Sequence, residues 1–357
     1  MTCETDQNGP RLAIGPLNTA GQAFHWAEAC RRFGGFDATS FSGSRRKARR
    51  LTGPSHQRIL HHRVRPRALK SLFLDKALQN ATHLIVESYA TLLGDQRRDT
   101  LSMDLPWLRS RGLVVGSVFH GDDIRSPAAH LRRNPNSYFH LMTSQQNVSA
   151  DQSRATRRAV AVASGLPLFV STPDLLLDLP SATWLPLVVD LHTWRPLAPS
   201  LSRTKFRVLH MPSARMPPIK GTSYIHPVLL ELHAEGVLEY IAPGPVRHEE
   251  MPALVQSVDV VIDQVLTGSY GVAAIEAMAA GRLVLGGVDP EVRALIDGDV
   301  PILDAGPSEL EGLLREVCRS PERFREVAQD GIRYARHFHS GQLSAEVLRP
   351  FVASAMS

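Results

Sequence analysis

The sequence has few cysteines and no long apolar run. Its three cysteines, Cys3, Cys30 and Cys318, are scattered along 357 residues, and no CxxC or Cys/His cluster is present. This pattern argues against a disulfide framework or a zinc site and favours a reducing cytoplasm. No apolar stretch approaches the ~20 residues that span a bilayer. The polar segment from Met1 to Pro10 lacks the apolar core of a signal peptide, so we expect a cytoplasmic protein.

The net charge is also small. The chain has 40 Lys and Arg residues and 35 Asp and Glu residues, which gives a net charge of +5. The excess gathers in the run from Arg45 to Arg50 and in the stretch from Arg63 to Lys70. Such clusters favour polyanions, and the first run predicts peripheral contact with an anionic membrane at the inner face. The alternative is a solvated loop followed by a basic helix face. We expect no nucleic-acid partner.

Short apolar runs alternate with charged helical stretches along the whole chain. This βαβ pattern predicts the α/β class, with parallel sheets covered by helices on both faces. The proline-interrupted stretch 193–202 reads as a linker. We therefore predict two Rossmann-like, doubly wound domains, 1–195 and 203–338, facing a cleft. Ligands of such sheets bind beyond the carboxyl ends of the strands, where polar residues do follow the predicted strands.

The strongest motif runs from Asp263, at a predicted strand end, to Gly281. Small residues at Ser269 to Val272 open a helix, whose first N–H groups can hold a diphosphate. Gly268 and Gly271 permit close approach of a phosphate. Glu276 lies on the same helix among small and apolar neighbours, so its carboxylate needs a partner and could accept hydrogen bonds from a ribose diol. The alternative is an exposed helix carboxylate.

A second motif follows the first strand of the predicted second domain. Arg215 and Lys220 lie in a loop stiffened by prolines, where two cations suit a diphosphate leaving group. Two surface cations beside a turn are the alternative.

Two further motifs follow strands of the predicted first domain. His120 comes directly after the apolar strand 113–119, where its imidazole could bind a sugar hydroxyl, and Asp122, Asp123 or Arg125 could position an acceptor. A structural histidine and a divalent metal on the Asp pair remain alternatives. The loop from Gly15 to Ala23 lacks the GxGxxG spacing and reads as a phosphate or acceptor contact, or as an ordinary turn.

Together these motifs resemble those of retaining glycosyltransferases of the GT-B fold, the glycosyltransferase group 1 family. The resemblance covers both predicted domains and is carried by the residues from Asn18 to Ala23, His120 to Asp123, the R-x4-K pair Arg215 and Lys220, and Tyr270 to Gly281. It implies a metal-independent hexosyltransferase that needs no cofactor and uses a UDP- or GDP-linked sugar as co-substrate. It also implies that residues 339–357 form a helix crossing back to the first domain.

The resemblance assigns roles to particular residues. Near the reacting groups it places His120, Arg215 and Lys220. It gives donor binding to the second domain and acceptor binding to the first. The donor-binding residues that it implies are Gly268, Ser269, Tyr270, Gly271, Val272 and Glu276, and the position of the first glycine loop adds Gly21. From their positions after predicted strands we expect Asn18, Asp122, Asp123 and Arg125 to bind the acceptor.

One position departs from the family motif, which usually carries two glutamates with seven residues between them. Glu276 matches the second, but Gly268 stands at the first. Either Gln264 or Asp263 substitutes for the missing carboxylate, or the donor sugar differs, or activity is lost. A catalytically silent binding subunit and a sugar-nucleotide epimerase of the same fold are the alternative functions.

Overall fold

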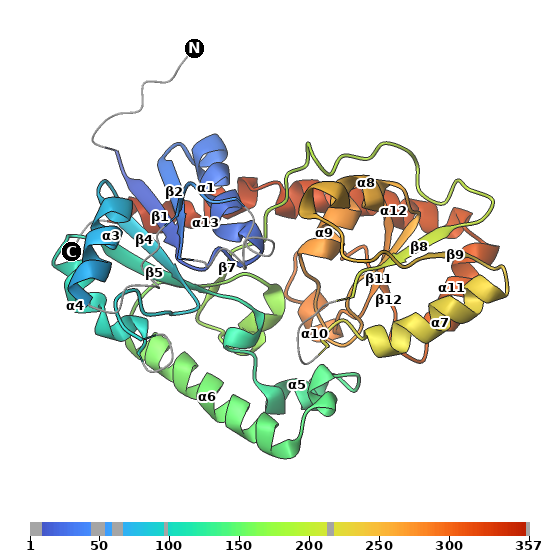
Figure 1. Cartoon of the computed structure of the whole chain (residues 1–357), viewed down its shortest axis with the longest axis horizontal. Helices are drawn as coiled ribbons and strands as arrows, with labels where there is room; N and C mark the ends of the chain where they lie inside the picture. Colours follow the sequence, from blue (N-terminus) through green and yellow to red (C-terminus); the bar gives the residue numbers. More distant parts are fainter. Residues whose placement is uncertain (1–8, 44–53, 59–66, 96–98, 213–217, 355–357) are drawn as a thin grey trace, which may run out of the picture. The chain divides into compact units, whose positions relative to one another are not determined.

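The computed structural model describes residues 9–43, 54–58, 67–95, 99–212 and 218–354. The chain divides into two compact units (Figure 1). Unit 1 comprises residues 1–125, 153–188 and 341–357, and unit 2 comprises residues 126–152 and 189–340. The segment 126–152, which the sequence prediction placed in the first domain, therefore groups with the second.

Unit 1 is built on a seven-stranded parallel sheet in the order β3-β2-β1-β4-β5-β6-β7. Its strands are β1 (Arg11–Gly15), β2 (Asp37–Ser42), β3 (Gln57–Arg58), β4 (His83–Glu87), β5 (Val114–Phe119), β6 (Leu168–Val170) and β7 (Thr183–Trp184). β7 ends at Trp184, since the ladder cannot continue through Pro186, which has no N–H. Its carbonyl instead accepts hydrogen bonds from Trp26 and Ser344.

Helices cover both faces of this sheet (Figure 1). One face carries α1 (Gln22–Ala29) and α13 (Gln342–Ala353), and the other carries α3 (Arg67–Leu78), α4 (Leu105–Arg109) and the second half of α6 (Ser144–Ala163). The inward side of α1 is buried, since Ala23, Trp26, Ala27 and the following Cys30 are all fully buried.

Unit 2 is built on a five-stranded parallel sheet in the order β12-β11-β10-β8-β9. Its strands are β8 (Arg207–His210), β9 (Glu239–Ile241), β10 (Val260–Ile262), β11 (Leu283–Gly286) and β12 (Leu303–Asp304). The buried carboxylate of Asp259 ties the start of β8 to β10, because it accepts from the Arg207 N–H and pairs with Arg203.

In unit 2, α8, α9 and α12 lie on one face of the sheet, and α7 and α11 lie on the other (Figure 1). The helices are α5 (Pro127–Arg133), α7 (Thr222–Ala234), α8 (Met251–Gln256), α9 (Val272–Ala279), α10 (Pro290–Arg293), α11 (Leu310–Arg319) and α12 (Glu322–His339). The predicted α/β class with two parallel sheets is thereby confirmed. No helix in the described ranges is long and apolar enough to cross a membrane.

Register fixes which side chains meet. In unit 1, Gly15 of β1 lies beside Val86 of β4, and Glu87 lies beside Val118 of β5. In unit 2, Ile262 of β10 lies between His210 of β8 and Leu285 of β11. The residues that follow these strands therefore gather at one edge of each sheet.

Candidate functional site

The loop between β10 and α9 turns its carbonyl groups inward. Five carbonyl oxygens of this loop each accept a hydrogen bond from a donor in unit 2. The acceptor residues are Gln264, Leu266, Thr267, Gly268 and Ser269, and their donors are the Gly287 N–H, the Tyr138 N–H, His130 Nε2, the Asp289 N–H and the Gln264 amide. Because these carbonyl groups point into unit 2, several main-chain N–H groups of the loop point away from it.

Several N–H groups of the same loop have no acceptor among the described residues. Within the described ranges the structure gives no acceptor to the N–H groups of Gly268, Ser269, Gly271, Val272 and Ala273. The last two belong to the first turn of α9, where the helix dipole adds partial positive charge. Such a row of main-chain donors is an anion-binding arrangement.

A buried hydroxyl lies in the middle of this row. Ser269 is 2% exposed, and its Oγ has no hydrogen-bond partner among the residues that the structure describes. A buried hydroxyl without a partner carries a free-energy cost, which a bound anion would remove. The neighbouring Tyr270 side chain is buried instead: its hydroxyl bonds the hydroxyl of Tyr334 at 2.7 Å and lies 3.4 Å from Nε2 of His339. Any ligand contact of Tyr270 would therefore come from its main chain.

Lys220 lies beside this loop and is fixed to it. Its carbonyl accepts the Val265 N–H at 3.2 Å, and the Thr267 hydroxyl donates to the preceding Ile219 carbonyl. Lys220 Nζ lies 3.0 Å from Oδ1 of the nearly buried Asp263. That carboxylate oxygen makes no geometrically satisfactory hydrogen bond, so the contact is an ion pair at close range only. The cation is thus held ready next to the row of N–H groups.

Glu276 completes this group of charges in unit 2. It lies one turn into α9 and is partly buried, and no described residue gives its carboxyl group a hydrogen bond or an ion pair. Burial raises the pKa of Glu276 to about 8, the Lys220 charge opposes this rise, and the Asp263 charge adds to it. At neutral pH the carboxyl group is therefore mostly protonated and could both donate and accept hydrogen bonds with a ligand.

His210, at the end of β8, is a structural neighbour of this group. Burial lowers the pKa of His210 to about 4, so its imidazole is neutral. Its nitrogens bond the Ile262 carbonyl and the Thr222 hydroxyl, each at 2.9 Å. His210 thereby ties β8, β10 and α7 together beneath Lys220.

Unit 1 has its own polar cluster, centred on a residue that the sequence motifs did not reveal. Glu87, the last residue of β4, is fully buried. Its carboxylate accepts the N–H groups of Leu17 at 2.7 Å, Asn18 at 2.6 Å and Thr19 at 3.0 Å. Burial alone would raise the pKa of Glu87, but hydrogen bonds from His120 and from the loop outweigh it, so the pKa lies below its usual value.

The predicted loop residues are shaped by this contact. Asn18 is buried with φ 51°, its amide donates to the Pro54 carbonyl, and its Oδ1 accepts the Phe24 N–H. Gly21 has φ 76° and precedes α1, a conformation that glycine adopts without strain. The loop is therefore folded around the Glu87 carboxylate.

His120 lies directly after β5, as predicted, and both ring nitrogens are engaged within unit 1. Nε2 lies 3.2 Å from Oε1 of Glu87, and Nδ1 lies 3.1 Å from Oγ of Ser171. The ring also stacks on Trp26 with centroids 5.8 Å apart. A sugar contact through the imidazole therefore requires replacement of one of these bonds.

The predicted acceptor residues that follow His120 all have partners in unit 1. Arg125 is buried and bonds Asp174 through Nε and Nη2, at 3.0 and 2.7 Å. Asp122 pairs with Arg125 at 3.3 Å, and Asp123 accepts the Ser88 hydroxyl at 2.6 Å. These contacts brace the turn, and the acceptor role of the three residues stays a prediction.

The two substitutes considered for a carboxylate at position 268 are already engaged. Gln264 donates to the Ser269 carbonyl, and Asp263 pairs with Lys220. The structure instead brings Asp289, 21 positions further along the chain, against Gly268. Sequence reasoning missed this residue because no motif links the two positions.

Two predictions fall on residues that the structure does not describe. Arg215 and the basic run from Arg45 to Arg50 lie outside the described ranges. Within those ranges, no group of three or more His, Cys, Asp or Glu side chains is placed to hold a metal ion.

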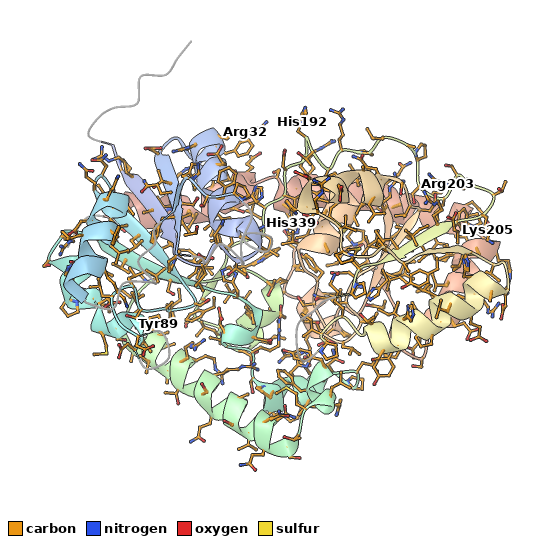
Figure 2. All side chains as sticks on the ribbon, viewed as in Figure 1. Arg32, Tyr89, His192, Arg203, Lys205 and His339 are labelled. Carbon is orange, nitrogen blue, oxygen red and sulfur yellow. The ribbon has the colours of Figure 1, made fainter. Side chains whose placement is uncertain are left out.

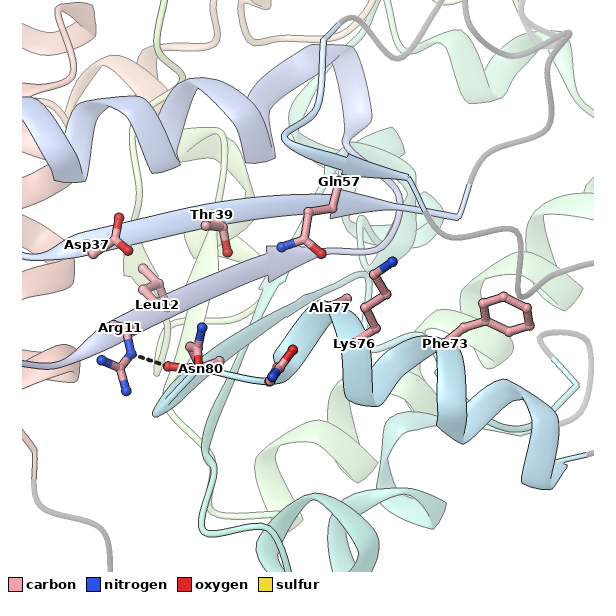
Figure 3. A pocket seen from close by; sticks show the side chains of 11 residues that line it. Arg11, Leu12, Asp37, Thr39, Gln57, Phe73, Lys76, Ala77 and Asn80 are labelled. Atoms are coloured by element: carbon pink, nitrogen blue, oxygen red, sulfur yellow. Dashed lines mark hydrogen bonds between the residues drawn. The ribbon is translucent and has the colours of Figure 1, made fainter. Parts of the chain in front are cut away.

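Unit 1 also contains a pocket of 610 Å³ (Figure 3). It is lined by Arg11 and Asp37, the first residues of β1 and β2, and by Lys76 and Asn80 around the end of α3. It thus opens at the amino ends of the strands, whereas Glu87 and His120 follow carboxyl ends.

Comparison with known proteins places the fold. No protein-family model and no curated protein matches the chain. The structure is similar to sucrose-phosphate synthase from Thermosynechococcus elongatus, with TM-score 0.62 and 13% identity over 97% of this chain and 100% of that one. It is also similar to Anabaena HepE in complex with UDP and glucose, with TM-score 0.58 and 13% identity over the same shares. The fold is that of GT-B glycosyltransferases.

A third structure of this fold is WaaG, described as a glycosyltransferase involved in lipopolysaccharide biosynthesis. Its TM-score is 0.50, with 11% identity over 96% of this chain and 100% of that one. HepE has also been solved with UDP-glucose and with UDP. At these identities the likeness establishes the GT-B fold and leaves activity to be argued from the residues of this chain.

Proposed function

We propose that this protein is a metal-independent retaining glycosyltransferase that uses a nucleotide-diphosphate sugar. The observation that carries the proposal is the β10–α9 loop, with its inward carbonyls, unused N–H groups and unpartnered Ser269 hydroxyl. A diphosphate is the ligand whose oxygens match such a row of donors. Solved structures of the same fold that contain UDP or UDP-glucose support the assignment.

Lys220, Glu276 and Arg215 then each have a role in the reaction. Lys220 and the first turn of α9 offset the negative charge that grows on the departing diphosphate. Glu276 binds the ribose diol, whose hydroxyls supply the partner that the carboxyl group lacks. Arg215 acts with Lys220, as the resemblance implies.

Retention is what the resemblance implies, and Glu87 does not supply the nucleophile that a double displacement with retention would need. Glu87 is buried and bonded by three N–H groups and His120, so its carboxylate is not available to attack a sugar carbon. We therefore propose front-face attack, with the leaving phosphate helping to deprotonate the acceptor. The same engagement of Glu87 argues against its use as the acid or base of an epimerase.

Calorimetric titration of the full chain with UDP, GDP and ADP tests the proposal. We expect one of them to bind without added metal, and a nucleotide sugar of the same base to release free sugar slowly when no acceptor is present. Failure of all three to bind would remove the proposal and favour a catalytically silent subunit. The expected donors are UDP- or GDP-linked sugars, and the acceptor and the membrane contact of residues 45–50 remain to be found by assay.

A further inference from the structure

The carboxylate of Asp289 packs directly on the α-carbon of Gly268. A β-carbon built on Gly268 would lie 2.1 Å from Oδ2 and 2.6 Å from Oδ1 of Asp289. The Asp289 N–H also donates to the Gly268 carbonyl at 3.0 Å. Position 268 therefore holds no side chain, and Asp289 occupies the space that one would take.

This contact puts a negative charge at the edge of the row of N–H groups that begins at Gly268. A carboxylate repels a phosphate at close range, so it marks where the anion-binding row ends. It accepts hydrogen bonds and donates none, so the groups it can bind at that edge are donors such as hydroxyls. Arg133 Nε lies 3.9 Å from Asp289 Oδ2, and this ion pair offsets part of the charge.

The Asp289 side chain does not cap the helix that it precedes. It precedes α10, where an Asp side chain ordinarily accepts an N–H group of the first helical turn. Here the side chain makes no such capping bond. Its placement against Gly268 is thus not a by-product of helix capping.

We propose that Asp289 is a specificity-determining residue that accepts hydrogen bonds from hydroxyl groups of the donor sugar. The inference rests on the proposed function, because a diphosphate on the β10–α9 loop carries its sugar on the terminal phosphate, next to this edge. The ligand class is a sugar with free hydroxyls near the diphosphate. Hydrogen bonds to a charged acceptor discriminate by roughly ten- to hundredfold in affinity.

A binding cycle tests the inference. Wild type and Asp289→Asn are titrated with UDP and UDP-glucose, GDP and GDP-mannose, and ADP and ADP-glucose. We expect Asp289→Asn to bind the free diphosphate at least as tightly as wild type, because a negative charge near the phosphates is removed. We expect the same variant to lose ten- to hundredfold in affinity for the matching nucleotide sugar. Glu291→Gln, an exposed carboxylate on α10, is the matched control and should change neither affinity. Asp289→Ser provides a second variant, and thermal unfolding confirms that each is folded.

The outcomes separate the two ideas. If no diphosphate binds to wild type, the proposed function fails. If a diphosphate binds but Asp289→Asn weakens it as much as it weakens the nucleotide sugar, Asp289 only shapes the loop and the inference is overturned. Equal affinities of wild type and variant for both ligands overturn it as well.

Discussion

Glu87 and His120 lie at the ends of adjacent strands, with Oε1 and Nε2 3.2 Å apart. The carboxylate also holds the N–H groups of Leu17, Asn18 and Thr19, and it is fully buried. One side chain therefore fixes the first βα loop and the orientation of the imidazole together. Its loss would affect both.

We predict that Glu87→Gln lowers the free energy of unfolding by about 2–4 kcal/mol. The reason is that the NH₂ group of the new amide would face the main-chain N–H donors of residues 17–19 in a buried site. Chemical denaturation measures the change. Glu28→Gln, an exposed residue of α1 that pairs with Arg31, should change stability by less than about 1 kcal/mol. Equal unfolding of both variants would show that the Glu87 contacts contribute little.

The stabilisation from Glu87 should depend on pH in a defined direction. The pKa of Glu87 in the folded protein lies below its usual value. Its contribution is therefore present above the unfolded-state pKa and is lost as the pH falls through the folded-state pKa. The difference between wild type and Glu87→Gln should be largest near neutral pH and shrink in acid. A constant difference from neutral pH into acid would contradict an ionised Glu87.

Lys220→Ala should lower turnover by roughly 10²–10³, the effect of removing one preorganised group that stabilises the leaving charge. Lys220 Nζ is held at 3.0 Å from Asp263, so the cation needs no reorganisation to meet a diphosphate. Release of sugar from the nucleotide sugar that binds measures the rate. Lys205→Ala, an exposed lysine labelled in Figure 2, is the control and should retain full turnover. Near-normal turnover in Lys220→Ala would contradict its role.

An ionised Glu276 should lower the free energy of unfolding of the unliganded protein at alkaline pH. Its pKa rises from the usual 4.5 to about 8 on folding. Between these values the folded protein keeps a proton that the unfolded chain releases, so the free energy of unfolding falls as the pH rises. We predict that Glu276→Gln matches wild type at pH 4 and is more stable at pH 9 by about 1–3 kcal/mol. Urea denaturation at several pH values measures the difference, and parallel curves for the two proteins would refute the shift.

Ligand binding should reverse this effect. A ribose diol that donates to the Glu276 carboxylate favours the ionised form and lowers its pKa in the complex. Affinity for the nucleoside diphosphate should therefore rise between pH 6 and pH 8 in wild type. In Glu276→Gln this rise should be reduced. If the two proteins show the same pH dependence, Glu276 does not bind the diol through its carboxylate.

The sequence pattern was sufficient for features that depend on local order. Alternation of apolar runs and helices predicted the two parallel sheets, and the rule that ligands lie beyond strand ends brought Asp263, Lys220 and Glu276 together. Boundaries shifted where hydrogen bonding decided them: the helix expected from Ser269 begins at Val272, because Gly268 to Gly271 form the open loop.

What the sequence could not reveal depends on contacts between distant residues. Glu87 ends an apolar strand, and its loop donors are 68 to 70 residues away. Nothing near Glu87 in the chain indicates that its side chain turns toward that loop. Asp289 likewise meets Gly268 only because the turns after β10 and β11 lie side by side. The departure at Gly268 was visible in the motif, but its physical cause required the fold.

Ser269 offers a test that separates binding from stability. Its Oγ is buried without a partner, so Ser269→Ala should leave the free energy of unfolding unchanged or raise it slightly, since an unsatisfied polar atom is removed. Affinity for the nucleoside diphosphate should fall by roughly three- to tenfold, because one donor to the phosphate is lost. Calorimetry and chemical denaturation measure the two quantities.

The matched control for this prediction is Ser137→Ala, which changes an equally buried serine of the same unit. The Ser137 hydroxyl bonds Nδ1 of His130 at 2.6 Å and accepts the Phe139 N–H. Its removal leaves two buried donors or acceptors unpaired and should cost about 1–3 kcal/mol of stability. Ser269→Ala could instead destabilise the protein as Ser137→Ala does and bind the diphosphate like wild type. In that case the Ser269 hydroxyl has a structural role, and it no longer supports an anion-binding site in this loop.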